Sequence, residues 1–306
     1  MTPRFFYRRQ FIPRLAGIIR DALRRRDTRD AMFISLMGGI GDLVNAFPSF
    51  ERVSHKMPVD LGTGGGPYRA LAEASPYLRR VYAPFVYKPI RRAHRRLIER
   101  ALRPFYGQVV LLDEADSTWR TRGRHMSEVY AERCGCEAPA RGTVYVPAAA
   151  RQAAGRFLAE HRLERFVYVV QLIRRRRPER SWPLAHYQAL YRGLSARVAL
   201  PLLVHTVGSD ETAVPDRCVH LASADILTVA ALIERASLFI GPDTGPTHIA
   251  AALGVPTVSI HIGYAPAVCR ALGDNVTVIA QRQPLDDPAS VSPDEVLRGV
   301  ERAAAA

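Results

Sequence analysis

The sequence predicts an α/β fold with two halves of similar size and a cleft between them. Three observations support this. Short apolar segments alternate with helical ones, a glycine-rich turn follows the first strand, and the alternation restarts after residue 150. Such alternation is typical of a mostly parallel sheet covered by helices on both faces. A chain of 306 residues is long enough for two such domains.

The first 30 residues form a basic extension with nine arginines and three aspartates. Leu15, Ile18 and Ala22 recur at helical spacing among these arginines. This pattern predicts a basic amphipathic helix, which is typical of binding to a membrane surface or to an anionic partner. The alternative is a helix whose apolar stripe packs on the body of the protein.

We expect the N-terminal domain to span residues 31–150. Its first strand is 31–36, the glycine-rich turn is 37–42, and a helix starts near Leu43. Further strands are predicted at 58–61, 81–83 and 108–113. A second basic block covers 86–104, where one helix would carry four arginines, namely Arg91, Arg92, Arg95 and Arg96. This surface is either solvated or faces an acidic ligand.

We expect the C-terminal domain to span residues 151–306, after a linker-like stretch at 147–152. Its predicted strands are 166–172, 200–206, 237–240 and 257–261, and its helices are 184–194, 225–235 and 247–253. A last helix at 292–304 has Ser292 as its cap and Glu295 at the third position. That helix either belongs to this domain or packs back on the N-terminal one.

Composition narrows the function classes. The net charge of +14 favours acidic partners such as nucleic acid, anionic lipid or phosphorylated substrates. Nucleic acid is not expected, because no helix-turn-helix, RNA-recognition or zinc-finger pattern is present. Four scattered cysteines, no membrane-spanning run and no secretory signal predict a cytoplasmic protein. Contact with the inner face of the cytoplasmic membrane is the further possibility.

The segment 241–248 reads Gly-Pro-Asp-Thr-Gly-Pro-Thr-His and joins a strand to a helix. Glycines allow a ligand to approach the backbone, and a helix start attracts an anion. We therefore expect a diphosphate at the helix start, bound by Thr244, Gly245, Thr247 and His248. Asp243 would repel phosphate, so we expect it to accept hydrogen bonds from sugar hydroxyls. The plainer alternative is a capped helix with a core histidine.

This segment, continued to Pro256, resembles the signature of glycosyltransferase family 9, the heptosyltransferases of lipopolysaccharide core assembly and their relatives. The resemblance implies the GT-B fold, two Rossmann-like domains facing across a cleft with the donor held mainly by the C-terminal one. It also implies an inverting transfer that needs no cofactor and no catalytic metal. ADP-heptose is the donor it favours.

Two more motifs carry the resemblance. The segment 35–48 resembles the family's Gly-Asp turn, which implies Asp42 as the general base. An inverting transfer needs a carboxylate to take the acceptor proton, and the helix dipole favours its charged form. Asp42 equally suits a helix cap. The segment 180–187, Arg-Ser-Trp-Pro-Leu-Ala-His-Tyr, resembles the family's Lys-x-Trp-Pro stretch and implies that Arg180 binds the diphosphate. His125 is expected to be structural.

The sequence departs from the family pattern at two places. A Pro-Gly pair is absent after strand 166–172, and the Gly-x-Thr-x-Pro turn is here Gly263-Tyr264-Ala265-Pro266. The leading hypothesis is heptose transfer to a phosphorylated glycolipid core, with the basic blocks attracting that acceptor. The alternatives are an inactive nucleotide-sugar-binding or scaffold protein of the same fold, or a transferase with another nucleotide sugar and a non-lipid acceptor.

Overall fold

A computed structural model describes residues 10–36, 38–85, 92–112, 123–208, 212 and 214–305. The chain forms two compact units. The first combines Met1–Arg122 with Met126–Pro139, and the second combines Gly123–His125 with Ala140–Ala306. Among the described residues, no helix has both the length and the apolar character needed to cross a bilayer.

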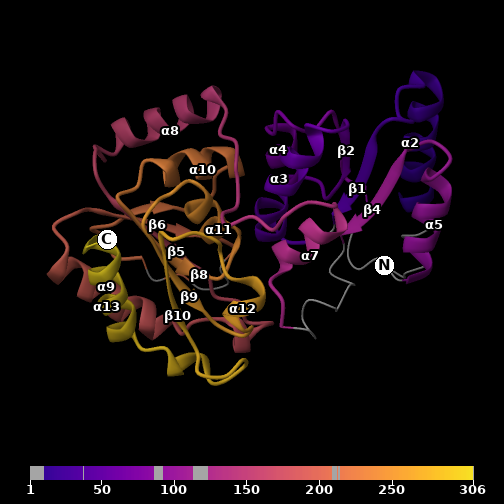
Figure 1. Cartoon of the computed structure of the whole chain (residues 1–306). Coiled ribbons are helices and arrows are strands. Elements are labelled where there is room, and N and C mark those ends of the chain that lie inside the picture. The colour runs from indigo at the N-terminus through magenta and orange to yellow at the C-terminus, as the bar shows by residue number, and fades with distance from the viewer. Residues whose placement is uncertain are drawn as a thin grey trace. The chain divides into compact units, whose positions relative to one another are not determined.

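The first unit is built on a parallel sheet of four strands in the order β3-β2-β1-β4 (Figure 1). The strands are β1 (Met32–Leu36), β2 (Val59–Gly62), β3 (Arg80–Tyr82) and β4 (Gln108–Leu112). The helices are α2 (Ile12–Arg25), α3 (Ile40–Ser54), α4 (Pro67–Glu73), α5 (Arg92–Leu102) and α7 (Met126–Arg133). The predicted strands of this half are confirmed. The order reverses between β1 and β4, and open α/β sheets bind ligands at the carboxyl ends of the strands beside such a reversal.

The apolar stripe of the N-terminal extension is part of the core of this unit. Phe11, Leu15, Ile18 and Ala22 are all less than 5% exposed. They join a cluster whose other buried members come from the sheet, the loops next to its strands and α5, namely Ala31, Phe33, Phe85, Ile98, Leu102, Tyr106 and Leu111. Of the two interpretations of this helix, the described residues show the one in which it covers the body. Its arginines remain on the exposed side.

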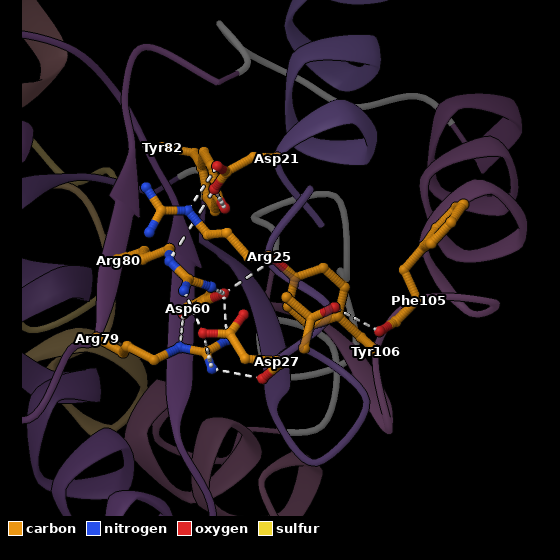
Figure 2. A network of polar contacts seen from close by, with 10 residues as sticks. Asp21, Arg25, Asp27, Asp60, Arg79, Arg80, Tyr82, Phe105 and Tyr106 are labelled. Atoms are coloured by element: carbon orange, nitrogen blue, oxygen red, sulfur yellow. Dashed lines mark hydrogen bonds and ion pairs between the residues drawn. The ribbon is translucent and has the colours of Figure 1, made fainter. Parts of the chain in front are cut away.

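A network of ion pairs fixes the chain after α2 to the sheet (Figure 2). Asp60 on β2 is fully buried, and both of its carboxylate oxygens accept hydrogen bonds of 2.8 Å from Arg79. The Tyr106 hydroxyl donates a third bond to Asp60, of 2.9 Å. Arg80 extends the network to Asp27, which follows α2. The arginines thus compensate the cost of burying a carboxylate while they anchor the extension.

The second unit contains a parallel sheet of six strands in the order β10-β9-β8-β5-β6-β7 (Figure 1). The strands are β5 (Val167–Gln171), β6 (Leu202–Thr206), β7 (Val219–Leu221), β8 (Leu238–Pro242), β9 (Thr257–His261) and β10 (Val276–Ala280). Counted from β5, this is the order 6-5-4-1-2-3 of a complete Rossmann sheet. The reversal lies between β5 and β8. The two-sheet α/β class predicted from the sequence is confirmed.

Helices cover both faces of this second sheet. α8 (Ala148–Glu160), α10 (Ile226–Glu234) and α11 (Gly245–Ala252) lie on one face, and α9 (Leu184–Arg197) and α13 (Pro293–Ala305) lie on the other (Figure 1). α13 packs against α9, β9 and β10 of its own unit. Its predicted cap is confirmed, because Ser292 and Glu295 exchange side-chain-to-backbone hydrogen bonds of 2.8 and 3.2 Å.

The structure differs from the sequence prediction in the second unit, where it has two strands that were not predicted, β7 and β10, and a helix in place of the predicted linker. The linker expected at 147–152 is instead the first turn of α8, which begins at Ala148. Pro147 directly precedes the helix, and the first three residues of the helix are alanines. Alanine has the highest helix propensity, so an alanine run next to a proline indicates a helix start at least as well as a linker.

Candidate active site

The predicted functional residues gather at the carboxyl ends of strands within each unit. In the first unit, the turn after β1 leads into α3 and carries Asp42. In the second unit, the loop after β5 carries Arg180, and the turn after β8 carries Asp243 and the start of α11. Both positions flank the reversal of strand order in their own sheet, which is where open α/β sheets bind ligands.

Asp42 lies at the third position of α3 and is 8% exposed. Its Oδ2 accepts a hydrogen bond from the backbone N–H of Gly39, as a capping residue does. Its Oδ1 accepts a bond of 2.7 Å from the hydroxyl of Tyr130 on α7. Both carboxylate oxygens are therefore oriented by hydrogen bonds. The capping role and the proposed base role are compatible in this geometry.

Gly38 makes this arrangement possible. A Cβ built on Gly38 would lie 2.4 Å from Cγ of Asp42, closer than any real contact. A side chain there would displace the carboxylate or the turn. The absence of a side chain at Gly38 thus allows the Asp42 carboxylate to lie close to the backbone of the turn.

The predicted acceptor-side arginines divide into three groups. Arg91 lies outside the described residues, and so does the side chain of Arg92. Arg96 lines a shallow surface depression on α5 together with Arg100 and Arg103. Arg95 donates a hydrogen bond of 3.5 Å to the carbonyl of Leu111, near the carboxyl end of β4.

Arg133 was not predicted, and it also reaches that strand end. It donates a bond of 2.6 Å from the end of α7 to the carbonyl of Leu111. Arg95 and Arg133 therefore bind the same carbonyl on β4. This strand is the neighbour of β1, which leads into the turn with Asp42. The signal in the sequence was the position of Arg133 three residues after Tyr130 on a helix, which places both on one face.

In the second unit, the segment 241–248 forms the predicted strand-to-helix turn. The Thr244 and Thr247 hydroxyls both donate to the carbonyl of Pro242, and they close the turn on itself. The N–H groups of Thr247 and His248 bond to the carbonyl of Thr244. This pattern leaves the N–H groups of Thr244 and Gly245 as the candidate donors to an anion at the helix start.

Asp243 has a charged environment that the sequence did not reveal. Burial alone would raise its pKa, but the hydrogen bond from His248 and the nearby charges of the histidines and Arg180 outweigh burial and lower it. The bond joins His248 Nε2 to Asp243 Oδ1 at 3.3 Å. His248 is only 5% exposed. It therefore holds the carboxylate here, and its predicted contact with phosphate stays a prediction.

Two further residues complete the cluster around Asp243. His261, the last residue of β9, is fully buried, and burial lowers its pKa. Cys269 ends α12 (Pro266–Cys269), and its Sγ lies 3.8 Å from Asp243 Oδ2 and 3.7 Å from His261 Nε2. Sequence reasoning missed both, because neither belongs to the 241–248 motif. The available signal was the position of His261 at the end of β9, because β9 is the next strand along the chain after β8.

Arg180 is placed by the tryptophan of its own motif. Trp182 is fully buried, and its Nε1 donates a bond of 2.7 Å to the carbonyl of Val291. The loop after β5 is thereby fastened to the core two residues beyond Arg180. The Nε atom of Arg180 is buried and has no hydrogen-bond partner among the described residues. The charge of Arg180 interacts with Asp243 and is one of the causes that lower the pKa of that carboxyl group.

Tyr264 occupies the turn in which this sequence departs from the family pattern. Its ring lies under the guanidinium of Arg180, with 4.3 Å between the guanidinium carbon and the ring centroid. Gly263 has a φ of 101°, and a Cβ there would lie 2.9 Å from Cγ of Arg180. The turn is also held by a bond of 2.7 Å from the Gly263 N–H to Gln281. The altered turn thus supports Arg180 by a cation–π contact.

His125 has the structural role that was expected of it. Its ring is 6% exposed, and Nε2 lies 2.9 Å from the carbonyl of Arg270, within the second unit. A buried histidine satisfied by a backbone carbonyl needs no ligand to explain it.

Solved structures share this fold. One is a family 9 glycosyltransferase from Veillonella parvula, with 14% identity, a TM-score of 0.67 and coverage of 91% of this chain and 98% of that one. Another is ADP-heptose lps heptosyltransferase II of E. coli, with 15% identity, a TM-score of 0.63 and coverage of 90% and 98%. A third is E. coli heptosyltransferase WaaC with ADP, with 17% identity, a TM-score of 0.58 and coverage of 89% and 99%.

Among curated proteins, no match is found. The family model that describes glycosyltransferase family 9 (heptosyltransferase) matches residues 128–294, which is more than half of the chain. The matched region contains the Arg180 loop, the 241–248 turn and the Asp243 cluster. Together with the two Rossmann-like sheets, this match shows that the chain belongs to glycosyltransferase family 9, the heptosyltransferase family.

Proposed function

We propose that this protein transfers a heptose from ADP-heptose to a hydroxyl of a phosphorylated glycolipid core, with inversion at the anomeric carbon. The observation that carries the proposal is the grouping of Arg180, Asp243 and the α11 start at the β5/β8 reversal of a Rossmann sheet. The diphosphate needs a cation and backbone N–H donors, which Arg180 and the start of α11 can supply. The hydroxyl groups of the sugar need a hydrogen-bond acceptor, which Asp243 can supply. E. coli WaaC with ADP has the same fold, which supports a nucleotide donor.

The proposed chemistry uses the residues of this chain as follows. The acceptor oxygen attacks the anomeric carbon while Asp42 takes its proton. The bond between that carbon and the diphosphate oxygen breaks, and its electron pair stays on the leaving diphosphate. Arg180 and the start of α11 stabilise the charge that develops there. Because these groups stabilise the leaving charge, the proposal requires no metal, and the protein should remain active after treatment with a chelator.

The acceptor side rests on charge. The net charge of +14, the exposed arginines of α2 and the arginines around α5 and β4 favour an anionic acceptor presented at a membrane surface. We propose that the enzyme works in the cytoplasm at the inner face of the cytoplasmic membrane. The attraction should be electrostatic, so binding to vesicles with anionic lipid should fall as salt is raised from low to physiological concentration.

The experiment that tests the function is a donor screen that follows release of the nucleoside diphosphate. ADP-heptose should turn over fastest, with other nucleotide sugars and a delipidated acceptor as comparisons. Asp42→Asn should reduce kcat by about 10²–10⁴-fold and leave donor affinity unchanged, since it removes only the proton acceptor. Full turnover in Asp42→Asn would show that another group is the base.

The screen also separates the alternatives. Nucleotide-sugar binding without turnover of any donor in the native chain points to the scaffold protein. Faster turnover of another nucleotide sugar with a non-lipid acceptor points to the related transferase. If no nucleotide sugar raises the melting temperature, the proposed donor site is wrong.

A further inference from the structure

Three side chains of types that bind metals meet at the carboxyl ends of β8 and β9. Asp243 follows β8, His261 ends β9, and Cys269 ends α12. One ligand atom of each lies within 4.8 Å of the others. They are 10%, 0% and 5% exposed in turn, so water is largely excluded from the space between them.

The spacing suits a small tetrahedral ion. With bonds of about 2.3 Å to sulfur and about 2.0–2.1 Å to nitrogen and oxygen, a tetrahedron separates sulfur from the other ligands by roughly 3.5 Å. Cys269 Sγ lies 3.7 Å from His261 Nε2 and 3.8 Å from Asp243 Oδ2. The two separations from sulfur therefore need to shorten by only a few tenths of an ångström.

The ring of His261 can offer one nitrogen to the ion. Nε2 faces Cys269 Sγ at 3.7 Å, whereas Nδ1 lies 4.0 Å from Oδ1 of Asp243. Since a ring gives one nitrogen to an ion, Nε2 is the ligand, and Nδ1 can keep the proton on the side of the carboxylate.

The charges are also compatible. A thiolate and a carboxylate together neutralise a divalent ion, while the nearby guanidinium of Arg180 favours ligands that stay anionic. Thiolate and imidazole ligands select Zn²⁺ and related ions over Mg²⁺ and Ca²⁺. The bond from His248 to Asp243 Oδ1 orients the carboxylate, as outer partners do at metal sites.

We propose that Asp243, His261 and Cys269 form a binding site for one divalent transition-metal ion of the Zn²⁺ class. Binding forms one bond from each side chain to the metal and releases the thiol proton of Cys269 to solvent. The three protein ligands leave a fourth position open to water or a substrate oxygen.

The site has a consequence that rests on the proposed function. Asp243 is the residue expected to hold the donor sugar, so a metal on its carboxylate and the donor should oppose each other's binding. This opposition is reciprocal. Saturating Zn²⁺ should then raise the Kd of ADP-heptose and slow transfer, and chelation should reverse both effects. If saturating Zn²⁺ leaves the Kd of ADP-heptose unchanged, the metal and the donor do not compete for Asp243.

The direct experiment uses the full chain alone, reduced and freed of metal with a chelator. Titration with Co²⁺ should reach one equivalent and produce a thiolate-to-cobalt charge-transfer band that Zn²⁺ abolishes. Cys269→Ser should lose the band and weaken affinity by at least about tenfold, the smallest effect expected for a lost metal partner. Cys218→Ser is the matched control, because Cys218 is a free cysteine of the same unit outside the cluster. This variant should keep the band.

A second measurement needs no variant and so does not depend on folding of a mutant. X-ray absorption of the Zn²⁺-loaded native chain should show one sulfur neighbour, with nitrogen or oxygen as the others. Two sulfur neighbours would move the metal to the Cys134 and Cys136 pair and overturn the proposal. A shell without sulfur, or a band that survives in Cys269→Ser, would overturn it too. Because no donor is present, these outcomes do not depend on the transferase activity.

Discussion

Tyr130 is the partner that orients Asp42 in the first unit. Its hydroxyl donates to Oδ1 over 2.7 Å, and the pair is buried. A hydrogen bond to a charged group contributes about 1.5–3 kcal/mol, so Tyr130→Phe should lower kcat by roughly 10–100-fold. The ring stays in place, so donor affinity should be unchanged. Steady-state kinetics against ADP-heptose test this, and an unchanged kcat would show that the bond from Tyr130 is not needed to orient the carboxylate.

Tyr264 has the corresponding supporting role for Arg180 in the second unit. A cation–π contact of about 1 kcal/mol corresponds to roughly a fivefold change in affinity. Tyr264→Leu should therefore raise the KM for the donor by about that factor. Tyr264→Phe keeps the ring face and should restore the native value. Equal KM values for the two variants would show that the aromatic ring does not contribute to donor binding.

At the scale of elements, the Asp60 network connects the N-terminal extension to β2 and β3. Removing one partner of a buried ion pair leaves an uncompensated charge, which costs about 3–5 kcal/mol. Asp60→Ala should lower the free energy of unfolding of the first unit by up to this amount, because Arg79 loses both of its hydrogen bonds to Asp60 and keeps only its contacts with Asp27. Denaturant unfolding measures the change.

An exposed ion pair supplies the control for that experiment. Arg69 and Glu73 form an i,i+4 pair on α4, with side chains 56% and 46% exposed. Arg69→Ala should cost about 0.3–0.5 kcal/mol at most. A small effect in Asp60→Ala, similar to this control, would show that the network is not a stabilising anchor.

His205 on β6 gives the second sheet a stability that depends on pH. Burial lowers the pKa of this ring to about 4, and the neighbouring His220 contributes. The unfolded ring binds a proton below about pH 6.5, whereas the folded ring stays neutral until about pH 4. The unfolded state therefore binds more protons in this window. Stability should fall as pH decreases from about 6.5 to 4, by up to about 3 kcal/mol.

The variant His205→Asn tests this dependence, because an asparagine amide can replace the Nδ1 that faces the Tyr168 hydroxyl at 2.7 Å. Unfolding at several pH values should give a flatter profile in the variant than in the native chain. His261 has a lowered pKa as well, so the native profile contains both contributions. An identical slope in the two proteins would contradict the assignment to His205.

At the scale of the whole molecule, each unit has a hydrophobic cluster of its own. We expect two unfolding transitions, because two cores need not unfold together. A nucleotide held by the second unit should raise only its transition, by about 2.7 kcal/mol at a ligand concentration 100 times Kd. Asp60→Ala should lower only the other. Calorimetry with and without ADP tests this, and a single transition that shifts with both changes would contradict it.

Local patterns in the sequence determined the class of fold and part of the site. Apolar segments of strand length, helical periods and turn glycines are properties of neighbouring residues, so β1, β9 and the α13 cap were predictable. The Asp42 turn and the 241–248 turn were predictable for the same reason, since each motif lies within one strand-to-helix connection. The alanines at 148–150 were ambiguous, because residues that favour a helix also occur in linkers.

The tertiary structure alone decided which distant residues complete each site. Tyr130 reaches Asp42 from 88 positions away, and Cys269 lies 26 positions from Asp243. Strand order brings these residues to one edge, and strand order follows from long-range packing that no local period encodes. The same reason explains why the helix at the N-terminus could be predicted from its apolar spacing, whereas the surface on which it packs could not. The surface it covers, the core beside Phe33 and Phe85, exists only once the sheet has formed.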